Sequence, residues 1–106
     1  MPGEKIIIEV QHFEGCPNSS EMIKRVKSVI KHLPLEIDYK EILVETPELS
    51  QEIKFRGSPT VLVNGIDLEN LPEPLEGNLA CRYYAKGLPT EEQIKNFIIE
   101  HKSDNN

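Results

Sequence analysis

The residues with the clearest chemical potential in this 106-residue chain are its two cysteines, Cys16 and Cys81. Cys16 stands in the stretch FEGCPNSSEMIKRV, where an apolar run ends and a helix is expected to begin. Three residues later, where a second cysteine would complete a C-x-x-C pair, there is Ser19. Two interpretations of Cys16 are open: a reactive thiol at a helix start, or a small inert residue that packs as a hydrophobe.

A helix that begins just after Cys16 would favour its thiolate over its thiol. The first backbone N–H groups of a helix have no partner within it, and the helix dipole places partial positive charge at that end. Ser19 could donate a hydrogen bond to the thiolate, but it cannot attack a mixed disulfide as a thiol does. Cys81 is therefore the candidate resolving thiol, since attack needs only the approach of a second sulfur. A purely structural role for Cys81 is equally open.

The composition argues against several classes of function. A net charge of −6 disfavours nucleic acid, and no run of 18 apolar residues exists that would indicate a membrane span. There is no phosphate-binding glycine motif, and the three histidines lack zinc-ligand spacing, so no metal or other cofactor is expected. The start, MPGEKIIIEV, lacks the apolar region of a signal peptide, so a cytoplasmic location is expected. The oligomeric state is not indicated.

Hydrophobic periodicity and turn residues predict one domain over residues 1–106, with a frayed tail at 102–106. The predicted elements are strands at 5–13 and 35–42, helices at 18–33 and about 47–56, a hairpin within 60–69, an irregular loop at 70–89 and a helix from Thr90. Apolar residues on both faces of the first strand indicate a strand covered on both sides. A strand–helix–strand crossover should make the first two strands parallel.

Local signals set the ends of these elements. Thr46 is the expected N-cap of the second helix, and Gly57 its expected stop. Asn64-Gly65 is the signal of a two-residue hairpin turn. Thr90 and Gln93 form a capping box at the start of the last helix.

In this order of elements the chain resembles the thioredoxin-like superfamily over nearly its whole length. Gly15-Cys16-Pro17 precedes the first long helix, and Gly57-Ser58-Pro59-Thr60-Val61 opens the third strand. More narrowly, F-x-G-C-P, G-S-P-T-V-x-V-N-G and a later C-R-x-Y are similar to small bacterial thioredoxin-like proteins, some with alkylmercury-lyase-like names. The resemblance implies an α/β thioredoxin-like fold, with a four-stranded mixed sheet flanked by three helices in the order β-α-β-α-β-β-α.

The resemblance also implies a site. Pro59 should be cis, and Ser58 should offer its backbone to an extended partner, so that Ser58, Pro59 and Thr60 become candidate substrate-binding residues. The third strand should run antiparallel to the first, which brings Cys16, Pro59 and the loop carrying Cys81 to one edge of the sheet. The implied function is thiol–disulfide exchange with a protein or a small-molecule thiol or disulfide, using Cys16 with Ser19 and Cys81.

The chain departs from thioredoxins in having C-x-x-S and no tryptophan. C-x-x-S also resembles monothiol glutaredoxins, but their C-G-F-S motif is absent, so neither glutathione nor an iron–sulfur cluster is carried over. Two alternatives from other classes follow. One is a binder of soft metal ions such as mercury or copper through two thiolates. The other is a non-catalytic thioredoxin-like module that binds a protein partner.

Five further residues have predicted roles. His12 is expected to be a core or edge histidine rather than a group that polarises Cys16. Arg56 and Arg82 are either solvated surface arginines or groups that hold an anion or a thiolate. Tyr83 and Tyr84 are expected to pin the 70–89 loop onto the body of the protein.

Overall fold

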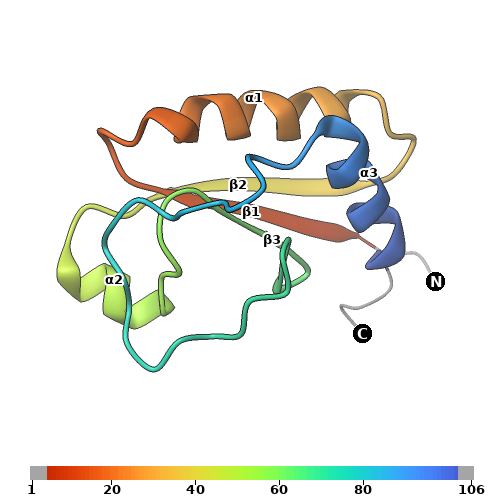
Figure 1. Ribbon diagram of the computed structural model, residues 1–106. Coiled ribbons are helices and arrows are strands. Elements are labelled where there is room, and N and C mark those ends of the chain that lie inside the picture. The colour runs from red at the N-terminus through yellow and green to blue at the C-terminus, as the bar shows by residue number, and fades with distance from the viewer. Residues whose placement is uncertain (1–4, 103–106) are drawn as a thin grey trace.

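The structure, a computed structural model, describes residues 5–102. Its elements are β1 (Ile6–His12), α1 (Pro17–Lys31), β2 (Ile37–Leu43), α2 (Pro47–Ile53), β3 (Thr60–Val63), β4 (Ile66–Asp67) and α3 (Glu91–Glu100). The predicted order and the mixed α/β class are confirmed (Figure 1). Apart from Lys102, the predicted tail lies outside the described residues.

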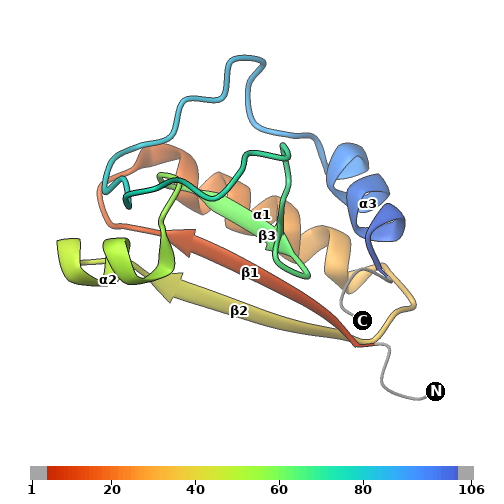
Figure 2. The ribbon, with the colours of Figure 1, turned by 90° about the horizontal axis from the view of Figure 1, so that it is seen from below.

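The strands form one mixed sheet in the order β2-β1-β3-β4, and Figure 2 shows β1 between β2 and β3. β1 and β2 are parallel, as the crossover predicts, and β3 runs antiparallel to β1 with Gln11 opposite Thr60. Asn64 and Gly65 both have positive φ, as the predicted hairpin turn requires. The antiparallel pairing brings the end of β1 and the start of β3 to the same edge.

The core lies on one face of this sheet, under α1 and α3. Ile6, Ile8 and Val10 of β1 are buried there against apolar residues of both helices. The opposite face of β1 is only partly covered: Ile7 is 36% exposed, whereas Gln11 is buried. The prediction of a strand covered on both sides therefore holds only toward its C-terminal end, because α2 lies on the other side of the sheet from α1 (Figure 1).

The second helix ends earlier than predicted. Lys54 adopts the left-handed conformation with φ 54°, and its N–H bonds to Ser50 and Gln51 carbonyls close the helix at Ile53. Gly57 has a different use: a Cβ atom there would lie 2.9 Å from the Cβ of Arg82. Glycine is needed because another segment of the chain passes against it.

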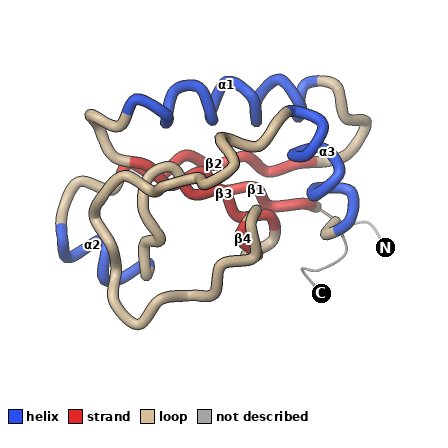
Figure 3. Tube along the Cα trace, in the orientation of Figure 1, coloured by secondary structure: helices blue, strands red, loops and turns tan. Residues whose placement is uncertain are grey.

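The segment between β4 and α3 is irregular, as predicted, and Figure 3 shows it as a long loop that returns past the edge of the sheet. Among the described residues, this loop makes one isolated β-bridge, a parallel one between Cys81 and Ser58. No helix within residues 5–102 is long and apolar enough to cross a membrane.

The predicted capping box of α3 is present. Thr90 accepts a hydrogen bond from the Gln93 N–H at 3.1 Å, and the Gln93 side chain accepts one from the Thr90 N–H at 2.9 Å. We expect Thr90→Ala to lower the free energy of unfolding by about 1 kcal/mol, since one N-terminal N–H loses its partner. Urea denaturation measures the change. Lys95→Ala on the same helix is the control, and an equal loss in both variants would contradict the assignment.

Candidate functional site

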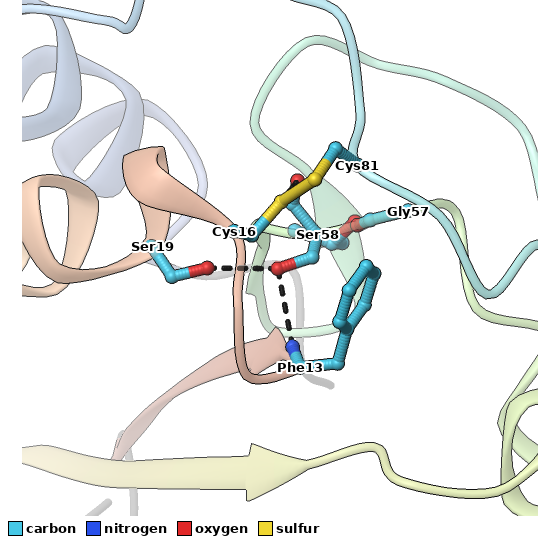
Figure 4. The surroundings of a disulfide bond; sticks show 7 residues. Phe13, Cys16, Ser19, Gly57, Ser58 and Cys81 are labelled. Atoms are coloured by element: carbon cyan, nitrogen blue, oxygen red, sulfur yellow. Dashed lines mark hydrogen bonds between the residues drawn. A yellow bond between two sulfur atoms is a disulfide. The ribbon is translucent and has the colours of Figure 1, made fainter.

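Cys16 and Cys81 form a disulfide at the edge where β1 ends and β3 begins (Figure 4). Their Cα atoms lie 5.9 Å apart, although 65 positions separate them in the sequence. Cys16 is the N-cap residue of α1, with extended backbone at φ −91° and ψ 115°. The predictions that Cys16 stands at a helix start, and that both cysteines share one edge, are confirmed.

The two cysteines differ in exposure. Cys16 is only 8% exposed, and its Sγ lies 3.4 Å from the carbonyl oxygen of Ser58. Cys81, on the loop, is exposed. In the disulfide, the exposed cysteine is therefore Cys81, which the sequence indicates as the candidate resolving thiol that reacts second.

The Ser58–Pro59 peptide bond is cis, as predicted. The backbone of Ser58 is fully used by the chain itself: its N–H donates to the Ala80 carbonyl at 2.8 Å, and its carbonyl accepts from the Arg82 N–H at 2.7 Å. Ser58, Pro59 and Thr60, the candidate substrate-binding residues, are all buried. An extended partner could pair with Ser58 only by displacing residues 80–82.

Ser19 has a different partner from the predicted one. Its hydroxyl lies 2.8 Å from the Ser58 hydroxyl, and the latter accepts a hydrogen bond from the Phe13 N–H at 3.1 Å. Figure 4 shows the two contacts reaching Ser58 from α1 and from the end of β1. Because its hydroxyl is bound to Ser58 rather than to a sulfur, Ser19 holds the Ser58 side chain between two elements.

Arg82 is neither a solvated arginine nor a ligand for an outside anion. Its side chain is 4% exposed and makes two hydrogen bonds to the Asp67 carboxylate, at 2.7 and 2.8 Å. It also donates to the Thr60 hydroxyl at 3.3 Å. Arg56 is also drawn toward this carboxylate, with its Nε 4.0 Å from Asp67 Oδ1, and donates to the Leu71 carbonyl.

Asp67 is the member of this group that sequence reasoning missed. Burial alone would raise the pKa of its carboxyl, but hydrogen bonds and charge from Arg82, with the N–H groups of Glu69 and Leu71, lower it below its ordinary value. The only indication of its role in the sequence was that a charged residue stands in a short strand of the hairpin predicted within residues 60–69. Nothing local pointed to Arg82, which is 15 residues away.

The two tyrosines behave differently. Tyr84 is buried, its hydroxyl donates to the Pro59 carbonyl, and its ring lies 4.7 Å from the Arg82 guanidinium. Burial raises the pKa of Tyr84, against the opposing charge of Arg82, so the phenol is a neutral donor. The pinning role is confirmed for Tyr84 and wrong for Tyr83, which is 84% exposed.

A shallow cavity of about 440 Å³ lies beside this edge, lined by Phe13, Glu14, Val44, Glu45 and Leu79. Glu14 stands two residues before Cys16, and Leu79 two before Cys81, so each has its Cα within about 7.6 Å of that cysteine's Cα. Within residues 5–102, no three or more histidine, cysteine or acidic side chains are grouped as a metal site. His12 is half-buried on β1.

No family model matches the chain. No curated protein is detectably similar to it either.

Proposed function

We propose that this chain is a thioredoxin-like protein that performs thiol–disulfide exchange through Cys16 and Cys81. The observation that carries the proposal is the pairing of these two cysteines at a helix N-terminus beside Pro59. In the oxidative direction, the two thiols reduce an external disulfide to two thiols and become the protein disulfide. In the reductive direction, two external thiols reverse the reaction.

The exposure of the two residues supports an assignment of roles. An external thiolate reaches Cys81, which is exposed, and forms a mixed disulfide there. Cys16 then leaves as a thiolate at the start of α1, where the helix dipole stabilises its negative charge. By reversibility, Cys81 is the first nucleophile in the oxidative direction and Cys16 the resolving thiol. This order is the reverse of the one expected from the sequence.

Oxidation of the reduced protein by excess 2-hydroxyethyl disulfide tests the proposal, with quenching by an alkylating agent and mass analysis. Wild type should proceed to the intramolecular disulfide. Cys16→Ser should stop as a mixed disulfide on Cys81, whereas Cys81→Ser should form its mixed disulfide at least about 10-fold more slowly, because Cys16 is buried.

The urea-unfolded wild type provides the intrinsic rates of both thiols. The proposal fails if the folded protein forms no intramolecular disulfide beyond the rate of the unfolded chain. The assignment of roles alone fails if Cys16 is the faster cysteine.

The soft-metal alternative would use the same two sulfurs. Their position at one edge suits a linear two-thiolate ligand set for a soft ion. The disulfide must first be reduced for such binding, because the thiolate is the metal ligand.

A further inference from the structure

We infer, on the basis of the proposed exchange function, that this site reacts with small thiols and disulfides and excludes extended polypeptides. The reason is that residues 80–82 occupy the Ser58 edge in the oxidised and the reduced protein alike. The chain's own segment thus stands where a peptide partner would form a strand-like pair.

The pairing of Ser58 leaves no backbone group for a peptide. Strand-like recognition needs a free N–H and a free carbonyl on the receiving residue. On Ser58 these groups are bound to Ala80 and Arg82 at 2.8 and 2.7 Å. A polypeptide must therefore open the segment before it can bind at this position.

Contacts other than the disulfide hold residues 80–82 in place. The buried Arg82 side chain binds Asp67 through both of its terminal nitrogens, and the adjacent Tyr84 hydroxyl binds the Pro59 carbonyl. On the other side of Cys81, the Asn78 N–H donates to the Phe55 carbonyl at 2.8 Å. Reduction removes the sulfur–sulfur bond and leaves all of these contacts, so the segment stays seated.

A small molecule has an approach that needs no opening. The cavity beside the site has a volume of about 440 Å³, within the range of roughly 300–1,000 Å³ of small-molecule pockets. Phe13 and Leu79 give it apolar surface. Because Glu14 and Glu45 also line it, uncharged probes are needed to separate size from charge.

The first test measures amide hydrogen exchange of the oxidised and the reduced protein. On reduction, the Ser58 and Arg82 amides should lose no more than about 10-fold protection beyond the loss at the amides of the β1–β3 pairing, which report the change in global stability. The amide of Asn78 should follow them. Exchange of these amides at the rate of an unstructured chain after reduction would overturn the inference.

The second test compares two uncharged disulfides whose leaving thiolates are both acylated cysteine amides, so that they differ in size rather than in thiol chemistry. One is the disulfide of N-acetylcysteine amide, and the other that of a blocked seven-residue peptide of valine and threonine with a central cysteine. Each rate is divided by the rate of the same probe with dithiothreitol. The reduced wild type should react with the small probe at least about 10-fold faster. The small probe approaches through the cavity, whereas the peptide can take the strand-like position beside Pro59 only after two backbone hydrogen bonds break.

Variants that loosen the segment should lower this ratio toward one. Arg82→Lys loses the two-pronged bond to Asp67, because an ammonium group cannot reproduce the guanidinium fork. Tyr84→Phe removes only the hydroxyl bond to Pro59, and it serves if Arg82→Lys does not fold. Tyr83→Ala is the matched control, since this neighbouring side chain is exposed and its loss should leave the ratio unchanged.

The outcomes separate the inference from the function on which it rests. No exchange with the small probe would end the proposed function. Equal normalised rates for both probes in wild type would preserve exchange and overturn the exclusion of peptides. A ratio that falls in Tyr83→Ala as far as in Arg82→Lys would show that the anchoring contacts do not control access.

Discussion

Cys81→Ser is expected to lower the free energy of unfolding by about 4 kcal/mol relative to the oxidised wild type, in the chain-entropy account of disulfides. The physical reason is the loop that the bond closes, since the two cysteines are 65 positions apart in the sequence. The bond removes conformations from the unfolded chain, and the number removed grows with loop length. Urea unfolding of the oxidised protein and of the variant measures the difference.

The reduced wild type is the control for this prediction. Under dithiothreitol, wild type and Cys81→Ser should have nearly the same unfolding midpoint, because the serine replaces an exposed residue. Equal stability of the oxidised and the reduced wild type would contradict the prediction. A large loss in the variant under reducing conditions would instead assign the effect to packing of Cys81.

Asp67→Asn is expected to destabilise the protein by about 3–5 kcal/mol, the usual cost of removing one partner of a buried ion pair. The Asp67 side chain has no exposed surface, and Arg82 would keep its charge with only the solvent-exposed Glu69 carboxylate nearby, at 3.7 Å. Residues 80–82 would lose their main anchor at the same time. Urea unfolding at neutral pH gives the size of the effect.

Glu69→Gln is the matched control for Asp67→Asn. Glu69 also faces Arg82, at 3.7 Å, but its side chain is 39% exposed. Solvent screens such a pair, so we expect a loss of about 1 kcal/mol or less. Similar losses of unfolding free energy in Asp67→Asn and Glu69→Gln would mean that burial of the Asp67–Arg82 pair does not increase its contribution to stability.

Because the pKa of Asp67 is lowered in the folded protein, the stability difference between wild type and Asp67→Asn should depend on pH. A carboxyl with a depressed pKa in the folded state stabilises the fold above its unfolded pKa of about 3.9. This contribution is lost as the pH falls from there through the folded value. The stability difference between wild type and Asp67→Asn should therefore be constant above about pH 5 and shrink in more acidic solution. A difference independent of pH down to about pH 2 would contradict the ionised state of Asp67.

The sequence by itself determined the features that depend on near neighbours along the chain. The Asn64-Gly65 turn, the Thr90 capping box and the order of the elements were all predictable, because turns, caps and hydrophobic periodicity act over a few residues. The end of α2 was predicted too late. Lys54 takes the left-handed position there, which residue type alone assigned to Gly57.

Placing both cysteines at one edge needed the resemblance to a known fold as well as the local pattern. The sequence left open whether Cys81 pairs with Cys16 or has a purely structural role, and the tertiary structure shows the two joined. Sequence reasoning left Arg82 as either a solvated surface arginine or a group that holds an anion or a thiolate. It did not predict the buried ion pair, because the partner Asp67 is remote along the chain. The same holds for Ser19 and Ser58, whose hydroxyls meet across α1 and the start of β3. Whether a polar group is buried and satisfied depends on what the rest of the chain brings beside it, and only the folded structure contains that information.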